Sequence, residues 1–251
     1  MKAKQYDLFI VLGSYYDENR QSRILVITSK GIYRSFKIRP TRFEASPVKG
    51  KGMVNGDTLL VFQTKYGDIL PITCVDLISD DVQYITRYLA NDKIIEVLVN
   101  INWNPATWEF MREASALVNR HPIFASITNN IVDSTKVRGW KKRPYTSYCE
   151  FSGYGEYGYS SLFGSMRNDQ RSKLLPQLSD CFKKIDASSK DKNPPLLPSY
   201  QNLISTVEPG VEAMMTYELN LRVTRLPKVT QAPDQGYPTI RNIEIIPLKN
   251  N

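Results

Sequence analysis

Short apolar runs separated by polar turns fill much of the first hundred residues of this 251-residue chain. Apolar runs of this length that are bounded by turn residues predict β-strands. The expected strands cover residues 7–16, 24–28, 32–39, 58–64, 69–78 and 93–102. The four residues 65–68 include Gly67 and predict a hairpin connection. A short helix is expected over residues 81–90.

The clearest helix is expected over residues 105–120. Asn104 supplies an N-cap, Pro105 suits the first helical position, and His121-Pro122 marks the end. A second helical region is expected over 166–187, broken or kinked at Pro176. Near the C-terminus, residues 211–224 alternate most regularly and predict a long antiparallel strand, and a last strand is expected over 239–248.

These elements predict an α+β fold that is predominantly antiparallel β. An OB-like architecture, or another small barrel or sandwich, with one or two packed helices is expected. The terminal strands look like partners for earlier ones, which favours a single intertwined domain over residues 1–251. A subdivision is also possible, into a β-rich region 1–135 that contains the helix 105–120, and a region 136–251 with a loop, a helix and the C-terminal strands.

Composition places the chain among globular proteins, with 41% hydrophobic residues. No apolar run approaches the roughly 20 residues of a membrane-spanning helix, and the apolar run after the N-terminus is too short for a signal peptide. Cys74, Cys149 and Cys181 match no metal or redox spacing, so three reduced and mostly buried thiols are expected. We therefore expect a cytoplasmic (host cell) or intravirion protein that is not secreted and has no membrane partner.

Positive charge gathers in two short stretches that also carry aromatic rings. The net charge is +8, yet residues 1–50 hold 10 Lys/Arg against 4 Asp/Glu and residues 51–100 hold 4 against 7. Cations neutralise phosphates and flat rings stack on bases, so such stretches favour a groove for single-stranded nucleic acid. The candidate binding residues are Tyr33, Lys37, Arg39, Arg42, Phe43, Lys49, Lys51, Lys136, Arg138, Trp140, Lys141, Lys142, Arg143 and Tyr145.

Alternation within the first stretch predicts which of its side chains face solvent. Ile32, Arg34, Phe36 and Ile38 fall on one face of a strand, and Tyr33, Ser35, Lys37 and Arg39 fall on the other. The second set, with one ring and two cations, is the expected solvent face. An ordinary amphipathic strand with a charged outer face is the plain alternative, and a solvated loop is the same alternative for residues 136–145.

Few residues suit catalysis. His121 is the only histidine, which disfavours zinc and histidine-dependent hydrolases. Gly153, Gly155 and Gly158 spell a dinucleotide fingerprint but lack the flanking strand and helix. Asp234 and Glu244 resemble the acidic part of a restriction-type nuclease core, but that core needs a lysine where Ile246 stands. We therefore expect no enzyme, no cofactor and no metal, with a nuclease as the weaker alternative.

The sequence thus predicts a non-catalytic protein that binds single-stranded DNA or RNA, in the replication or recombination of a phage, virus or plasmid. A structural subunit of a virion or other assembly is the alternative. It draws on residues 145–164, a segment too rich in glycine for a regular element and too rich in tyrosine for an ordinary linker, which favours self-association.

Overall fold

The computed structural model describes residues 7–48, 52–65, 67–92, 94–102, 107–121, 123–129, 160–164, 202–206, 213–219, 221 and 240–247. The chain divides into two compact units, residues 1–102 and 103–251. The expectation of one intertwined domain, or of a boundary near residue 135, stays a prediction.

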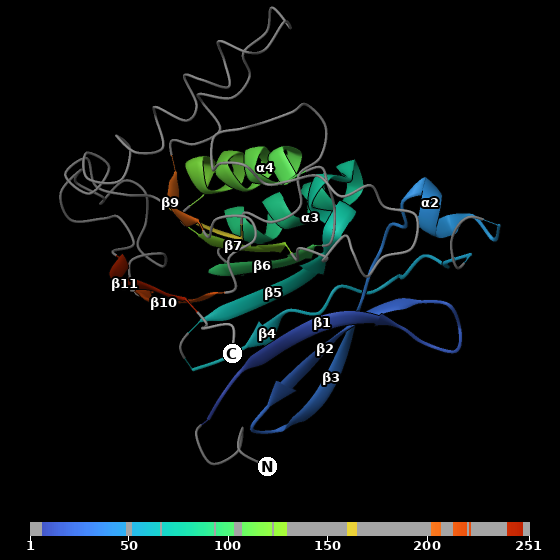
Figure 1. Ribbon diagram of the computed structural model, residues 1–251, viewed down its shortest axis with the longest axis horizontal. Helices are drawn as coiled ribbons and strands as arrows, with labels where there is room; N and C mark the ends of the chain where they lie inside the picture. Colours follow the sequence, from blue (N-terminus) through green and yellow to red (C-terminus); the bar gives the residue numbers. More distant parts are fainter. Residues whose placement is uncertain are drawn as a thin grey trace, which may run out of the picture. The chain divides into compact units, whose positions relative to one another are not determined.

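A three-stranded antiparallel sheet opens the first unit, in the order β1, β2, β3 (Figure 1). The strands span Ile10–Tyr16, Ser22–Thr28 and Gly31–Phe36. Ile24 on the central strand lies opposite Ser35 of β3, and both side chains are fully buried. Because opposite residues of an antiparallel pair point to the same side, this face of the sheet forms part of the core.

The second sheet of this unit has β5 (Asp68–Thr73) between β4 (Phe62–Gln63) and β6 (Val97–Asn102). β4 and β5 form the expected hairpin, whereas β5 and β6 run parallel, with Ile72 opposite Asn100. Parallel neighbours need a long crossover, and the 3-10 helix η1 (Cys74–Ile78) and helix α3 (Asp80–Asn91) provide it. β2 and β3 contact β5, which brings the two sheets of the unit together.

Helix α3 is amphipathic, as its sequence spacing requires. Val82, Thr86 and Ala90 recur every four residues and are buried, whereas Tyr84 and Tyr88 are exposed. Asp80 and Asp81 stand in the first turn, where negative charge favours the helix dipole. This confirms the helix expected over residues 81–90.

In the second unit, helix α4 (Thr107–Arg120) packs on strands β7 (Phe124–Asn129) and β8 (Ser161–Phe163). β8 pairs antiparallel with β7 and with β9 (Leu203–Thr206). The helix confirms the one expected over 105–120, and Met111, Ala114 and Val118 are buried at helical spacing.

A separate antiparallel hairpin pairs β10 (Ala213–Leu219) with β11 (Ile240–Pro247). Both strands were expected, over 211–224 and 239–248, and most residues that flank them lie outside the described residues. Met215, Tyr217 and Leu219 pack against the cluster of Phe124, Leu162 and Ile204. The helix expected over 166–187 lies outside the described residues, as does the loop 145–164 except for its end in β8.

The expected OB-like or other antiparallel barrel is wrong. The described sheets include the parallel pair β5–β6, with helix α3 in the crossover, and β1 and β3 are the open ends of their sheet. The sequence pattern misled because a buried apolar run reads alike in parallel and antiparallel strands. No helix among the described residues is long and apolar enough to cross a membrane.

Two strands of the first unit end earlier than the sequence predicts. The strand expected over 32–39 ends at Phe36, and the strand expected over 69–78 ends at Thr73. Cys74 has φ of 52°, a left-handed conformation that cannot continue a strand. Both truncated ends lie in the region described next.

Candidate functional site

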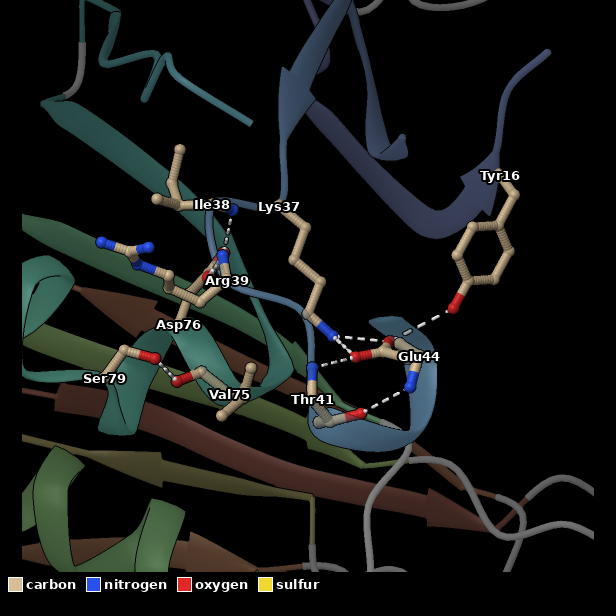
Figure 2. Close-up of polar contacts among 9 residues, drawn as sticks. All are labelled: Tyr16, Lys37, Ile38, Arg39, Thr41, Glu44, Val75, Asp76 and Ser79. Carbon is tan, nitrogen blue, oxygen red and sulfur yellow. Dashed lines mark hydrogen bonds and ion pairs between the residues drawn. The ribbon is translucent and has the colours of Figure 1, made fainter. Parts of the chain in front are cut away.

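Lys37 is the first residue after β3, and its side chain is only 1% exposed. Its Nζ atom lies 2.6 Å from both carboxylate oxygens of Glu44 (Figure 2). A buried ammonium group is costly unless it has a counter-charge and hydrogen bonds, and Glu44 supplies both. The pair is therefore the reason why a lysine can occupy this position.

The backbone around Lys37 is held from two sides. Its N–H donates to Ser22 O at 2.8 Å, and its carbonyl accepts from Gly56 N at 2.9 Å. A Cβ atom at Gly56 would lie 2.6 Å from that carbonyl oxygen and 2.5 Å from Phe36 Cβ. Glycine is required there because the two backbones approach so closely.

Glu44 is positioned by the short helix α2 (Arg42–Ala45), which Thr41 caps. Glu44 N donates to Thr41 Oγ1 at 3.1 Å, and Thr41 N donates to Glu44 Oε2 at 2.7 Å, which completes a capping box. Tyr16 donates its hydroxyl to Glu44 Oε1 at 3.2 Å. The Glu44 carboxylate thus joins β1, β3 and α2.

The pKa values of Glu44 and Tyr16 are shifted by burial and by the charges of Lys37 and Glu44. Burial opposes ionisation of Glu44, but the Lys37 charge and its hydrogen bonds outweigh it and hold the pKa of Glu44 below its usual value. Burial, with the adjacent Glu44 charge, raises the pKa of Tyr16 to about 12. Tyr16 therefore stays a neutral hydrogen-bond donor.

Asp76 in η1 contacts the same segment from the other side. Its Oδ2 accepts Ile38 N–H at 3.0 Å and its Oδ1 accepts Arg39 N–H at 2.8 Å (Figure 2). The residue is fully buried. Burial raises the pKa of Asp76 to about 6, although these backbone amides and the Lys37 charge act in the opposite direction.

Cys74 stands at the junction of β5 and η1, and its side chain is buried and not in a disulfide. A non-glycine residue at φ of 52° is strained, and such strain concentrates at functional sites. Cys74 begins η1, the same turn that holds Asp76. Tyr16, Lys37, Thr41, Glu44, Cys74 and Asp76 are hereafter called the polar cluster.

Two buried side-chain amides lie on the strand beside Cys74. Asn100 and Asn102 alternate on one face of β6, and neither amide has a hydrogen-bond partner among the described residues. β6 contacts η1, the helix that Cys74 begins.

Within the described part of the chain, His, Cys, Asp and Glu side chains form no group of three that could hold a metal.

The structure describes five of the predicted nucleic-acid-binding residues. Lys37 is buried against Glu44, whereas Tyr33, Arg39, Arg42 and Phe43 are exposed. Arg39 forms an ion pair with Asp81, and Tyr33 packs edge-on against Phe62 with ring centres 5.6 Å apart. Lys49, Lys51 and the stretch 136–145 lie outside the described residues.

The predicted solvent face of residues 32–39 is confirmed at Tyr33 and Arg39, which are exposed, and wrong at Ser35 and Lys37, which are buried. On the opposite face, Ile32 and Arg34 are exposed. Ser35 and Lys37 are buried because Ile24 of β2 lies on the same side as Ser35, and because the Glu44 carboxylate satisfies Lys37. Alternation assigns residues to two faces but does not say which positions the core covers.

No family model matches the chain, and no curated protein matches it either. Solved structures do resemble it. A CN-hydrolase superfamily protein from Xanthomonas campestris, with an arsenic adduct in its active site, has a TM-score of 0.47 and 14% identity; 76% of this chain and 74% of that chain are covered.

Two further solved structures resemble a smaller part of the chain. Nit3 from Saccharomyces cerevisiae, a nitrilase superfamily member, has a TM-score of 0.43 and 14% identity over 64% of this chain and 54% of its own. An amidase from Nesterenkonia has a TM-score of 0.44 and 11% identity over 64% and 57%. The chain thus spans little more than half the length of these two proteins, and at this level of likeness no residue role is transferred.

These findings correct the functional expectation. The solved structures that resemble the chain are described as members of hydrolase superfamilies and an amidase, in place of the expected non-catalytic nucleic-acid-binding or assembly protein of a phage or virus. Within the described residues, the buried Lys37–Glu44 pair removes the central cation of the first stretch from the surface.

The sequence alone does not reveal the polar cluster. It predicts Cys74 as a buried structural thiol and assigns no role to Glu44, because the single histidine disfavours a histidine-dependent nucleophile. The available signal was local: the apolar run of β5 ends in a cysteine, and Asp76 and Asp80 follow within six residues. A nucleophile after a strand and before a helix is a recurrent arrangement.

Proposed function

We propose that the chain is a cysteine-dependent hydrolase whose nucleophile is the Cys74 thiol. One observation carries the proposal. Cys74 is a buried, strained residue at the end of a strand, two residues before Asp76, whose carboxylate binds the segment that directly follows the buried Lys37 of the Lys37–Glu44 pair. A cysteine held only for packing needs neither the strain nor the charges.

The reaction class follows from what a thiolate can do beside a cation. The Cys74 sulfur attacks the carbonyl carbon of an acyl substrate, and the carbon–nitrogen bond of an amide breaks as the thiol proton leaves with the amine. Water then cleaves the thioester, which releases the acid and restores the thiol. Amide and water are consumed, and acid and amine are formed.

Lys37 and Glu44 have complementary roles in this proposal. The Lys37 ammonium favours negative charge on the sulfur or on the substrate oxygen, in the way that lysine and histidine cations activate other cysteines. Glu44 keeps that ammonium inside the protein and fixes its position with two short contacts. In this arrangement Lys37 and Glu44 take the place of the histidine that activates the nucleophile in histidine-dependent hydrolases.

Ammonia release from short aliphatic amides tests the proposal, and the amidase among the similar structures makes these the first substrates to try. Cys74→Ala should abolish release, and Lys37→Met should reduce it at least about 100-fold if the cation stabilises the developing charge. Cys149→Ala and Cys181→Ala are matched controls that should keep the wild-type rate.

A substrate-independent assay accompanies the first. Iodoacetamide should modify Cys74 in the native protein at a rate that saturates with pH, read by peptide mass spectrometry. A Cys74 thiol that reacts no faster than a free cysteine at any pH, together with amide hydrolysis that survives Cys74→Ala, would contradict the proposal.

A further inference from the structure

Asp76 connects the two halves of the polar cluster through its backbone contacts. It lies two residues after Cys74, and its carboxylate accepts the N–H groups of Ile38 and Arg39, which directly follow Lys37 (Figure 2). One buried carboxylate thus joins the turn that carries the thiol to the segment that carries the cation. Its two hydrogen bonds cross 37 and 38 positions of sequence.

We propose that Asp76 is a positioning residue that fixes the Lys37 ammonium relative to the Cys74 thiol. The inference deepens the proposed function and rests on it. Asp76 acts through the backbone at Ile38 and Arg39 and is not itself a reacting group. Its contribution is to hold the segment that begins at Lys37 in one register against η1.

The chemistry of the contact explains why an aspartate is needed. Two consecutive N–H groups require two acceptors, and an ionised carboxylate offers one oxygen to each. An asparagine of the same shape has one acceptor and one donor, so one of the two N–H groups would face another donor. The ionised side chain stays buried despite a raised pKa because these amides and Lys37 favour it.

The charged groups around Asp76 come from three elements. Lys37 lies at the end of β3 and favours the carboxylate, and Arg39 lies on the same segment with its guanidinium paired to Asp81 of α3. Glu44 of α2 is paired to Lys37. Removal of the Asp76 charge therefore also removes a negative charge near the thiol. Loss of that charge and loss of the positioning role shift the pKa of the thiol in opposite directions, so the direction of the shift distinguishes the two.

Alkylation of Cys74 by iodoacetamide, followed across pH in Asp76→Asn, separates the two possible effects. If Asp76 acted only through its charge, its removal would favour the thiolate and move the midpoint of the profile to lower pH. If it positions Lys37, the thiolate loses its cation and the midpoint moves upward. We expect an upward move of about one pH unit, which corresponds to about tenfold slower alkylation below the midpoint.

Ser79→Ala is the matched control. Ser79 Oγ donates to Val75 O at 2.7 Å in the same turn, and among the described residues its side chain forms no hydrogen bond with the segment 37–41. It should lose some thermal stability and leave the alkylation midpoint unchanged. Asp76→Glu keeps the charge and displaces it by one methylene group, so it should raise the midpoint less than Asp76→Asn and serves where the asparagine variant fails to fold.

Hydrogen exchange of residues 37–41 completes the test without use of the thiol. Faster exchange of the Ile38 and Arg39 amides in Asp76→Asn, with Ser79→Ala unchanged, is expected. An unchanged or lowered alkylation midpoint in both Asp76 variants would overturn the positioning role even if Cys74 proves reactive. An unreactive wild-type Cys74, together with amide hydrolysis that survives Cys74→Ala, would instead remove the proposed function, on which the inference rests.

Discussion

The α2 turn and the η1 turn each place one carboxylate against the segment that begins at Lys37, and the two carboxylates behave oppositely. Glu44 from α2 meets a buried ammonium, and its pKa falls below the usual value. Asp76 from η1 meets backbone amides, and its pKa rises to about 6. A full positive charge compensates for lost hydration, whereas two amide dipoles compensate only in part.

Because their pKa values shift in opposite directions, Glu44 and Asp76 also change the stability of the fold with pH in opposite directions. Glu44 has a lowered folded-state pKa, so it contributes stability above its ordinary pKa that is lost as the pH falls. Asp76 has a raised folded-state pKa, so between about pH 4 and 6 the folded protein binds a proton that the unfolded chain has released. Asp76 therefore costs stability as the pH rises from about 4 to about 6.

The largest effect is expected from Glu44→Gln. The substitution leaves the Lys37 ammonium buried without its counter-charge, which costs several kcal/mol in fully buried pairs. Glu44 is 20% exposed, so we expect a loss nearer about 2–3 kcal/mol in the free energy of unfolding at pH 7, measured by urea denaturation. Glu18→Gln, at an exposed glutamate, is the control and should change little. Equal losses in the two variants would contradict the ion pair's role.

The second effect concerns the pH dependence of Asp76→Asn. The difference in unfolding free energy, variant minus wild type, should rise by on the order of 2–3 kcal/mol between pH 4 and 7, because only the wild type must ionise a buried carboxyl in that window. Denaturation curves at several pH values give this difference. A difference that stays constant or falls with pH would show that Asp76 is ionised as easily as in the unfolded chain.

A smaller effect is expected from Thr41→Ala, which removes the capping box of α2. Loss of an N-cap hydroxyl costs about 1 kcal/mol, and here it also loosens Glu44. Ser79→Ala on the η1 side removes a hydrogen bond that is not a cap and should cost less. Thermal melts of both variants at pH 7 compare the two turns directly, and a larger loss in Ser79→Ala would reverse the expected order.

The smallest effect is expected at the exposed pair of Arg39 and Asp81, whose side chains are 48% and 42% exposed. Asp81→Asn should shift the melting temperature by no more than about 1 °C, and added salt should remove even that difference, because exposed ion pairs are screened. A salt-insensitive loss as large as that of Glu44→Gln would show that exposure does not separate the two pairs.

Local sequence signals located several elements of this chain well. The helix expected over 81–90 became α3, and the helix expected over 105–120 became α4. The hairpin of β4 and β5 formed around the connection that contains Gly67. These elements depend on spacing and capping between near neighbours, which one sequence states directly.

Sequence reasoning failed where a residue's partner lies far along the chain. Lys37 reads as a solvent-facing cation until Glu44 and the second sheet bury it. The same holds for Asp76, whose acceptor role depends on Ile38 and Arg39. Cys74 offered a local signal at the end of β5, but the link between its turn and the segment after Lys37 depends on the Asp76 contacts across 37 and 38 positions.

Composition and periodicity by themselves determined that this chain forms packed strands and amphipathic helices, and roughly where each begins. Tertiary structure alone decided that β5 and β6 run parallel and that Lys37 points inward. It also paired Lys37 with Glu44, and it tied the turn that Cys74 begins to the segment after Lys37 through Asp76. The physical reason is that strand direction, the choice of buried face and the partner of a charge are set by contacts between distant segments, whereas local patterns constrain only near neighbours.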